Sequence, residues 1–174
     1  AQSNPDVIVL LVGVWERMHF IDERYRGRSL GQYRTQVVDR FVDLVTRDGA
    51  EVVWVGAPPV RESTASDQLE FLNGVFEQVA EDDERVRYVD GGPVLTTPRG
   101  GYVDVATNPD GTRERIRRID GTHLCPGGAV RLATPVVHLI ADRWQIPVGE
   151  GWPNQGWRHH VPFDDGDVDC PAVG

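Results

Sequence analysis

The stretch Asp120-Gly-Thr-His-Leu-Cys-Pro-Gly-Gly128 places a carboxylate and an imidazole three residues apart, just before a helix-like run. A histidine that acts as a general base on a hydroxyl group needs a carboxylate to fix its tautomer and to stabilise its charged form. Asp120 and His123 could make that pair on one tight turn. The alternative is that Asp120 is only a helix cap or a turn residue, since a spacing of three is not specific to catalysis.

Continuous apolar, β-branched runs predict the strands that would position this turn. They cover residues 6–13, 51–56 and, in a shorter form, 87–90. If all three are buried parallel strands, the first of them is left with an unpaired edge. Either the segment that follows Gly100 or a neighbouring chain is expected to lie beside Val7–Val12.

Helical spacing of apolar residues predicts three helices between and after these strands. They are expected over residues 32–48, from a cap at Ser66 or Asp67 onward, and over 126–144. Residues 100–119 are expected to form a loop or an irregular hairpin with turns at 100–101 and 109–111. The alternation predicts an α/β fold of three layers, α/β/α, with a parallel sheet.

Ligands of such sheets bind at the carboxyl ends of the strands. Those ends are Gly13-Val-Trp-Glu16, Gly56-Ala-Pro-Pro59 and Asp90-Gly-Gly92. The Asp120–His123 turn can fold back to the same edge. We therefore expect the functional site there.

Length and charge limit the class of protein. A chain of 174 residues suits one domain, which we place at 1–148, followed by an irregular tail over 149–174 packed on it. The formal net charge of -9 argues against nucleic acid or an anionic membrane surface as a partner. The longest apolar run, Val7–Val14, is too short to cross a bilayer, and no signal peptide is present in the chain as given.

Two cysteines, Cys125 and Cys170, leave two alternatives open. They could be free and buried, or they could form a disulfide, which would indicate an oxidising compartment. The tail around Cys170 is rich in Gly, Pro, Trp and Asp and has little periodicity, which favours the bond as the means of holding it down.

At these residues the sequence resembles the SGNH (GDSL-type) hydrolases over most of residues 5–144. Asp120-Gly-Thr-His123 matches the family's Asp-x-x-His block before the last helix, and Gly13-Val-Trp-Glu16 stands where the family has Gly-x-Asn-Asp. WVGAPPVR, from Trp54 to Arg61, is similar to a subset of bacterial envelope proteins that includes domains attached to membrane acyltransferases. The resemblance implies an SGNH-hydrolase or flavodoxin-like fold that lacks its first strands.

The resemblance also implies roles for individual residues. His123 would be the general base, Asp120 its orienting carboxylate, and Gly13 an oxyanion donor through its backbone N–H. Trp15 stands where the family commonly has an asparagine donor, so Trp15 and Glu16 are candidates for oxyanion or substrate contacts. A sugar-stacking or core role for Trp15 is the alternative.

The family's nucleophile lies in a Gly-Asp-Ser block that this chain does not contain. None of the serines follows a strand in a tight turn: Ser29 and Ser63 are expected in loops, Ser66 at a cap, and Ser3 lies near a terminus. The nucleophile is therefore expected outside this chain. A separate chain, a swapped partner or a catalytically inactive relative would each explain its absence.

Two charged clusters are candidates for further sites. His159 and His160 with the following aspartates match neither a calcium loop nor a zinc motif, so a solvated acidic tail is the interpretation and no metal is expected. The basic run that ends in Arg117 and Arg118 is expected to be a solvated loop, with a substrate carboxylate or phosphate as the alternative ligand.

These observations predict a serine esterase or O-acetyltransferase that acts on carbohydrate esters of a bacterial cell envelope, without a cofactor, in a secreted or envelope location. Its partners would be an acylated carbohydrate or small ester and the missing N-terminal segment. The alternative is an inactive module that binds carbohydrate or serves a structural role.

Overall fold

The computed structural model describes residues 4–13, 32, 37–149, 151–153, 170–171 and 173. The described residues divide into two units. Unit 1 holds the residues up to Pro59 together with Ser63–Gly91, and unit 2 holds Val60–Glu62 together with the residues from Gly92 onward. The domain boundary predicted at residue 148 is not tested by this division and stays a prediction.

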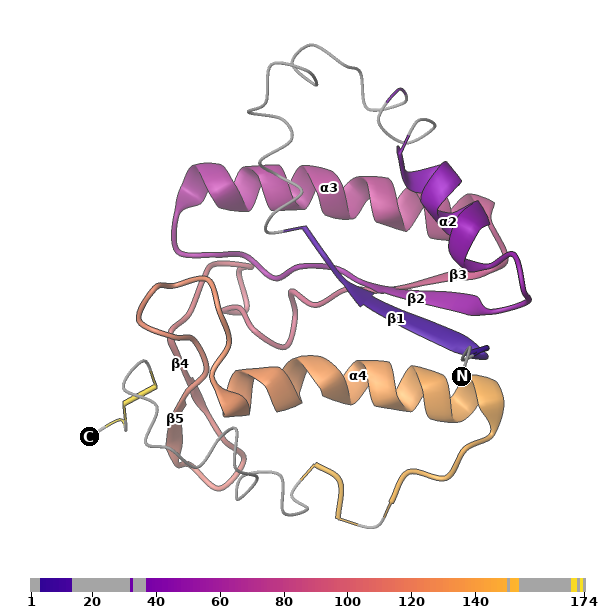
Figure 1. The fold of residues 1–174 in the computed structure, drawn as a ribbon. Coiled ribbons are helices and arrows are strands. Elements are labelled where there is room, and N and C mark those ends of the chain that lie inside the picture. Colours follow the sequence, from indigo (N-terminus) through magenta and orange to yellow (C-terminus); the bar gives the residue numbers. More distant parts are fainter. Residues whose placement is uncertain are drawn as a thin grey trace. The chain divides into compact units, whose positions relative to one another are not determined.

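Unit 1 is built on a parallel sheet whose strands are β1 (Val7–Leu11), β2 (Glu51–Val55) and β3 (Val86–Val89), in that spatial order (Figure 1). The register pairs Val9 with Val53 and Val53 with Arg87. β-Branched residues dominate β1 and β2, as expected for strands on a pleated surface, and β2 is largely buried. The three predicted parallel strands are confirmed.

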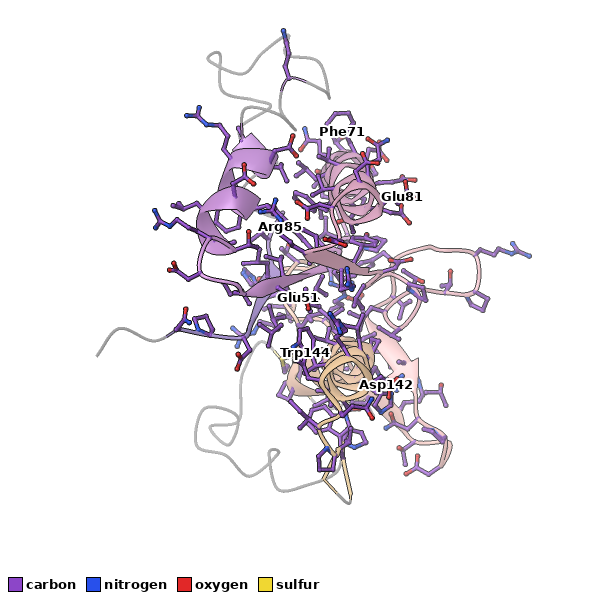
Figure 2. All side chains as sticks on the ribbon, turned by 90° about the vertical axis from the view of Figure 1, so that its right-hand side faces the viewer. Glu51, Phe71, Glu81, Arg85, Asp142 and Trp144 are labelled. Atoms are coloured by element: carbon purple, nitrogen blue, oxygen red, sulfur yellow. A yellow bond between two sulfur atoms is a disulfide. The ribbon has the colours of Figure 1, made fainter. Side chains whose placement is uncertain are left out.

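Two helices, α2 (Asp39–Val45) and α3 (Ser63–Asp82), connect these strands and lie on the same face of the sheet (Figures 1 and 2). Both crossovers step in the same direction along the sheet. Because such connections are right-handed, both helices are placed on one side. The protein therefore has the predicted α/β fold, with a parallel sheet flanked by helices.

The core of unit 1 lies between the sheet and these helices. Trp54 of β2 stacks on Phe76 of α3 with ring centroids 4.1 Å apart, and Phe41 meets the Trp54 ring edge-on at 6.1 Å. The side chains around this aromatic group are valines and leucines from both helices, β2 and β3. The buried members are Val38, Val42, Val52, Trp54, Leu72, Val75, Phe76, Val79 and Val86.

Two helix boundaries differ from those predicted. α3 begins at Ser63, so Ser66 lies inside the helix and is not its cap. No proline or glycine stands between Pro59 and Ser66, so nothing in the chain delays the start of the helix. The α-helical part of the predicted 32–48 helix is Asp39–Val45 in the described residues, and Gln32 is also helical.

The prediction that β1 is buried on both faces is wrong. Val9 and Leu11 are 46% and 53% exposed. The reason is the strand order: among the described residues β1 pairs with β2 alone and forms one edge of the sheet. The strands of the segment after Gly100 pair with each other. The expectation that this segment or a neighbouring chain lies beside β1 stays a prediction.

A cluster of charges ties α2 to the start of β3. Arg85, labelled in Figure 2, places its guanidinium 2.8 Å from the carboxylate of Asp43 and donates to the hydroxyl of Thr46. Asp83 accepts from the same guanidinium at 2.6 Å.

Phe71 lies on the outer side of α3 and is 42% exposed (Figure 2).

Unit 2 contains a short antiparallel hairpin and a long helix. The hairpin joins β4 (Val105–Thr107) to β5 (Arg113–Arg115), and the helix is α4 (Pro126–Trp144), whose bounds are those predicted. α4 begins close to Ile116, the residue that follows β5: a Cβ on Gly128 would lie 2.1 Å from the carbonyl oxygen of Ile116, so only glycine permits this approach. No helix in the described parts of the chain has the length and apolar content needed to span a bilayer.

Candidate active site

Asp120 and His123 meet on one turn of unit 2. Oδ1 of Asp120 accepts from the backbone N–H groups of Thr122, at 2.8 Å, and of His123, at 3.0 Å. Oδ2 lies 2.7 Å from Nδ1 of the His123 ring. Both carboxylate oxygens are thus engaged, and the same side chain shapes the turn and orients the imidazole.

These hydrogen bonds control the protonation of Asp120. Burial raises the pKa of its carboxyl, but the bonds from the His123 side chain and from the backbone N–H groups of Thr122 and His123 outweigh this effect and lower the pKa to about 2. Asp120 is therefore ionised at neutral pH and can only accept. Nδ1 of His123 must carry the proton, which leaves the lone pair of the neutral ring on Nε2.

The imidazole is accessible to a reactant. The His123 side chain is 61% exposed and that of Asp120 is 46% exposed. A neutral histidine with its lone pair on an exposed Nε2 and a carboxylate on Nδ1 can accept a proton from a hydroxyl group.

Backbone pairing holds the two ends of the turn together. The N–H of Arg118 donates to the carbonyl of His123 at 2.9 Å, and the N–H of Gly121 donates back to the carbonyl of Arg118 at 2.9 Å. Gly121 has φ +74°, a left-handed conformation that favours glycine. The residues that follow His123 lead directly into α4, so the imidazole stands at the entrance to a regular helix.

A disulfide fixes the chain two residues beyond His123. Cys125, the N-cap of α4, is bonded to Cys170, with Cα atoms 5.7 Å apart. Arg115 donates from Nε to the carbonyl of Pro171 at 3.2 Å, so the end of the tail contacts β5 as well. Of the two alternatives for the cysteines, the disulfide is confirmed.

Two arginines that contact this turn were not identified as site residues from the sequence. Arg61 donates to the carbonyl of Ile119 at 2.7 Å, and Arg117 donates to the carbonyl of Thr122 at 3.3 Å. Arg117 is 1% exposed, so the prediction that its basic run is a solvated loop is wrong at this position. No local sequence pattern predicts the contacts of Arg61, because the residues that its side chain contacts lie more than forty positions away in the chain.

The other predicted site residues belong to unit 1 or lie outside the described residues. Gly13 belongs to unit 1, where it is buried after β1, with φ +137° and a virtual Cβ 3.2 Å from Leu69. Its role as an oxyanion donor stays a prediction. Trp15 and Glu16, the other candidates for oxyanion or substrate contacts, lie outside the described residues.

Two of the four serines can be placed. Ser63 and Ser66 belong to the first turns of α3, so the expectation of a loop for Ser63 is wrong. Ser3 and Ser29 lie outside the described residues, as do His159, His160 and the aspartates that follow them. Within the part of the chain that is described, no group of three or more His, Cys, Asp or Glu residues is arranged to hold a metal ion.

Described residues of unit 2 line cavities of about 770 and 790 Å³. The first is lined by polar groups of the hairpin and by Arg131, and the second by threonines, prolines and aliphatic side chains. Neither lining includes Asp120 or His123, which lie on an exposed turn.

Comparison with known proteins places the fold and the family. A search of curated proteins gives no match. Among solved structures, the chain is similar to one described as "a putative platelet activating factor from Streptococcus pneumonia", with a TM-score of 0.56 and 19% sequence identity. The match covers 78% of this chain and 59% of that one, so the chain spans about three fifths of the length of that structure.

At this identity the likeness concerns the fold alone, and it agrees with the α/β architecture described above. Residues 1–139 match a family known by its description, "Protein of unknown function (DUF459)". This match includes both Asp120 and His123. The chain therefore belongs to the DUF459 family.

Proposed function

We propose that this chain carries the histidine–aspartate part of a serine esterase or O-acyltransferase site. The observation that carries the proposal is the 2.7 Å contact between Nδ1 of His123 and Oδ2 of Asp120, on a turn that leaves the ring exposed. The sequence resemblance to SGNH hydrolases supplies the reaction type.

In the proposed reaction, Nε2 of His123 accepts the proton of a serine hydroxyl while the serine oxygen attacks the carbonyl carbon of an ester. Asp120 stabilises the imidazolium that forms. When the tetrahedral species collapses, the bond to the alcohol breaks and the imidazolium returns the proton to the departing oxygen. Water or a sugar hydroxyl then repeats the sequence on the acyl-serine, which gives hydrolysis or transfer.

We propose that the serine comes from outside this chain. Ser63 and Ser66 are part of α3, a regular helix, and not of the strained turn that exposes a nucleophile. A segment N-terminal to this chain, a separate chain or a swapped partner would supply it.

The substrate we propose is an acetylated carbohydrate of the cell envelope. The net charge of -9 suits a neutral or cationic ligand better than a polyanion. The Cys125–Cys170 disulfide supports an extracytoplasmic location, because such bonds persist in oxidising compartments.

The test is labelling with a fluorophosphonate probe, read by intact mass, on this chain and on the native protein that contains it. We expect a label on the native protein only, with loss of the label in His123→Ala. His138→Ala is the matched control, because His138 is an exposed histidine on α4.

A label on this chain alone would overturn the assignment of the nucleophile. Absence of label from both proteins, with acetyl ester hydrolysis also absent, would overturn the enzyme proposal in favour of a binding or structural module. Equal loss in the His123 and His138 variants would show that the effect does not report on the site.

A further inference from the structure

Arg61 lies across the turn that carries Asp120 and His123. Its backbone N–H donates to the carbonyl of Gly121 at 3.0 Å, and its guanidinium Nη1 donates to the carbonyl of Ile119 at 2.7 Å. These two carbonyls flank Asp120 on either side. One residue therefore fixes both neighbours of the carboxylate that orients the imidazole.

Arg61 is itself held in place. Its Nη2 lies 2.7 Å from Oδ1 of Asp104, and the same oxygen accepts from the hydroxyl of Tyr102 at 2.6 Å. The guanidinium also stands over the Tyr102 ring, 5.6 Å from its centroid. Burial and the hydrogen bond to Asp104 raise the pKa of Tyr102 to about 12, so the phenol stays neutral and donates at physiological pH.

A second arginine holds the same turn from a buried position. Arg117 donates to the carbonyl of Thr122 at 3.3 Å, and its guanidinium lies 5.5 Å from the Tyr102 ring centroid. Its backbone N–H and that of Ile116 donate to the carbonyl of Asp104. Asp104 thus connects to the turn through its carboxylate, by way of Arg61, and through its backbone, by way of Arg117.

The contact between Arg61 and the turn leaves no spare room. A Cβ on Gly121 would lie 2.5 Å from Cβ of Arg61 and 3.0 Å from its Nε. The side chain and the turn are therefore fitted to each other, which is what a fixed geometry at Asp120 requires.

We infer that Arg61, fixed by Asp104, is a positioning residue for the Asp120–His123 pair. The inference rests on the proposed function for its catalytic consequence, but its structural content can be measured without activity. A planar guanidinium can donate to Ile119 and to Asp104 at once, whereas a lysine ammonium is a single point charge and cannot keep both directions. Because misplacement of a catalytic group by about 1 Å costs about 10²-fold in rate, the loss of this contact should be felt in kcat.

The experiment compares Arg61→Lys and Arg61→Ala with wild type. In this chain, carbon-13 NMR follows the titration of the Asp120 carboxyl. We expect its pKa to rise in both variants from about 2 toward the ordinary 3.8, because the turn no longer holds the carboxylate against its donors. In the native protein we expect kcat for acetyl ester hydrolysis to fall about 10²-fold with KM little changed.

Two control variants separate positioning from charge and from general stability. Arg99→Ala removes an exposed arginine of unit 2 and should leave the Asp120 pKa at about 2. Asn108→Ala breaks the contacts of Asn108 with Thr112 and Arg131 and should lower the thermal midpoint without moving that pKa. If both Arg61 variants fail to fold, Asp104→Ala gives the same test, because it removes the oxygen that accepts from Arg61 and Tyr102, and a rise in the Asp120 pKa is again expected.

An Asp120 pKa that stays at about 2 in the folded Arg61 variants would overturn the inference. A rise in Arg61→Ala alone, with none in Arg61→Lys, would also overturn it, because charge and not geometry would then be the cause. If the pKa rises as expected but the native protein has no esterase activity, the positioning role stands and the proposed function fails.

Discussion

Gly121 and Arg61 approach so closely that a β-carbon on the glycine would lie 2.5 Å from Cβ of the arginine. Gly121 also has φ +74°, so two separate constraints, one conformational and one steric, act at this position. It stands between Asp120 and His123 in sequence, and any side chain there would displace the turn or the arginine.

Gly121→Ala should therefore destabilise unit 2 more than Gly111→Ala. Gly111 has a similar φ of +84° but no atom within 4 Å of its virtual Cβ, so its substitution reports the conformational cost alone, about 1–2 kcal/mol. Gly121→Ala should exceed this cost and should also reduce the proposed esterase activity. Chemical denaturation measures the difference, and equal losses for the two variants would contradict the steric argument.

Asp120→Asn should inactivate the proposed enzyme without unfolding it. The amide oxygen can still accept from the backbone N–H groups of Thr122 and His123. Its NH₂ group would then face Nδ1 of His123 and force the proton onto Nε2, the wrong tautomer for a base. We expect kcat to fall about 10⁴-fold.

The matched control for that change is Asp110→Asn. Asp110 also accepts from a residue two positions ahead, through the N–H and hydroxyl of Thr112. Asp110 lies in the hairpin turn, so the Asp110→Asn change should leave kcat unchanged. Similar losses of activity in both variants would indicate a general effect of removing a turn aspartate.

The stability of the protein at low pH should depend on Asp120. Its pKa is lowered from 3.8 to about 2 in the folded chain, so ionised Asp120 contributes stability above pH 3.8 and loses that contribution as the pH falls toward 2. Between these values the thermal midpoint of wild type should fall more steeply than that of Asp120→Asn. Parallel curves for the two proteins would contradict the prediction.

The disulfide should contribute about 4 kcal/mol to the free energy of unfolding, as the chain-entropy model gives for a loop closed over 45 residues. The test replaces both Cys125 and Cys170 by alanine. Serine would place a hydroxyl group at the buried position of Cys125, which is 1% exposed. We expect a lower denaturation midpoint for this variant and a similar decrease for wild type under reducing conditions. Unchanged midpoints would show that the tail is held by other contacts.

Asn73 should stabilise the loop that follows β2. Its side-chain amide donates to the carbonyl of Ala57 at 2.8 Å and accepts from the Ala57 N–H at 2.9 Å. Asn73→Ala leaves both backbone groups without this partner and should cost about 2 kcal/mol. Asn73→Asp keeps the accepting oxygen but places a second carboxylate oxygen against the Ala57 carbonyl, so it should cost at least as much in denaturant unfolding. A free energy of unfolding equal to that of wild type in either variant would contradict the role of this side chain.

The sequence predicted the elements that depend on local pattern. Pro126–Trp144 combines a helical period with proline at its first position, and its bounds agree with α4. The turn at Pro109-Asp-Gly111 followed from turn chemistry, and of the loop and the irregular hairpin expected around it the structure has the hairpin. The burial of β1 could not be predicted, because Val9 and Leu11 have the composition of a central strand and only the strand order places them at an edge.

The same distinction applies to the candidate site. Asp120 and His123 could be identified because both partners lie on one turn. Arg61 could not, since its contacts with Asp104 and Ile119 span 43 and 58 residues. The burial of Arg117 could not be predicted, because arginines in a charged run are usually solvated and only the tertiary structure buries this one.

Neither unit corresponds to a continuous stretch of the chain, since Val60–Glu62 belong to unit 2 while the residues on both sides of them belong to unit 1. A fragment that starts at Gly92 would keep Asp120, His123 and both cysteines but would omit Arg61. Such a fragment would have the disulfide and the proposed catalytic pair, on a turn that has lost its contacts with Arg61. The part of the chain that holds Asp120 and His123 is therefore not a transferable module. Its excision or grafting has to include Val60–Glu62, which lie in sequence between the two segments of unit 1.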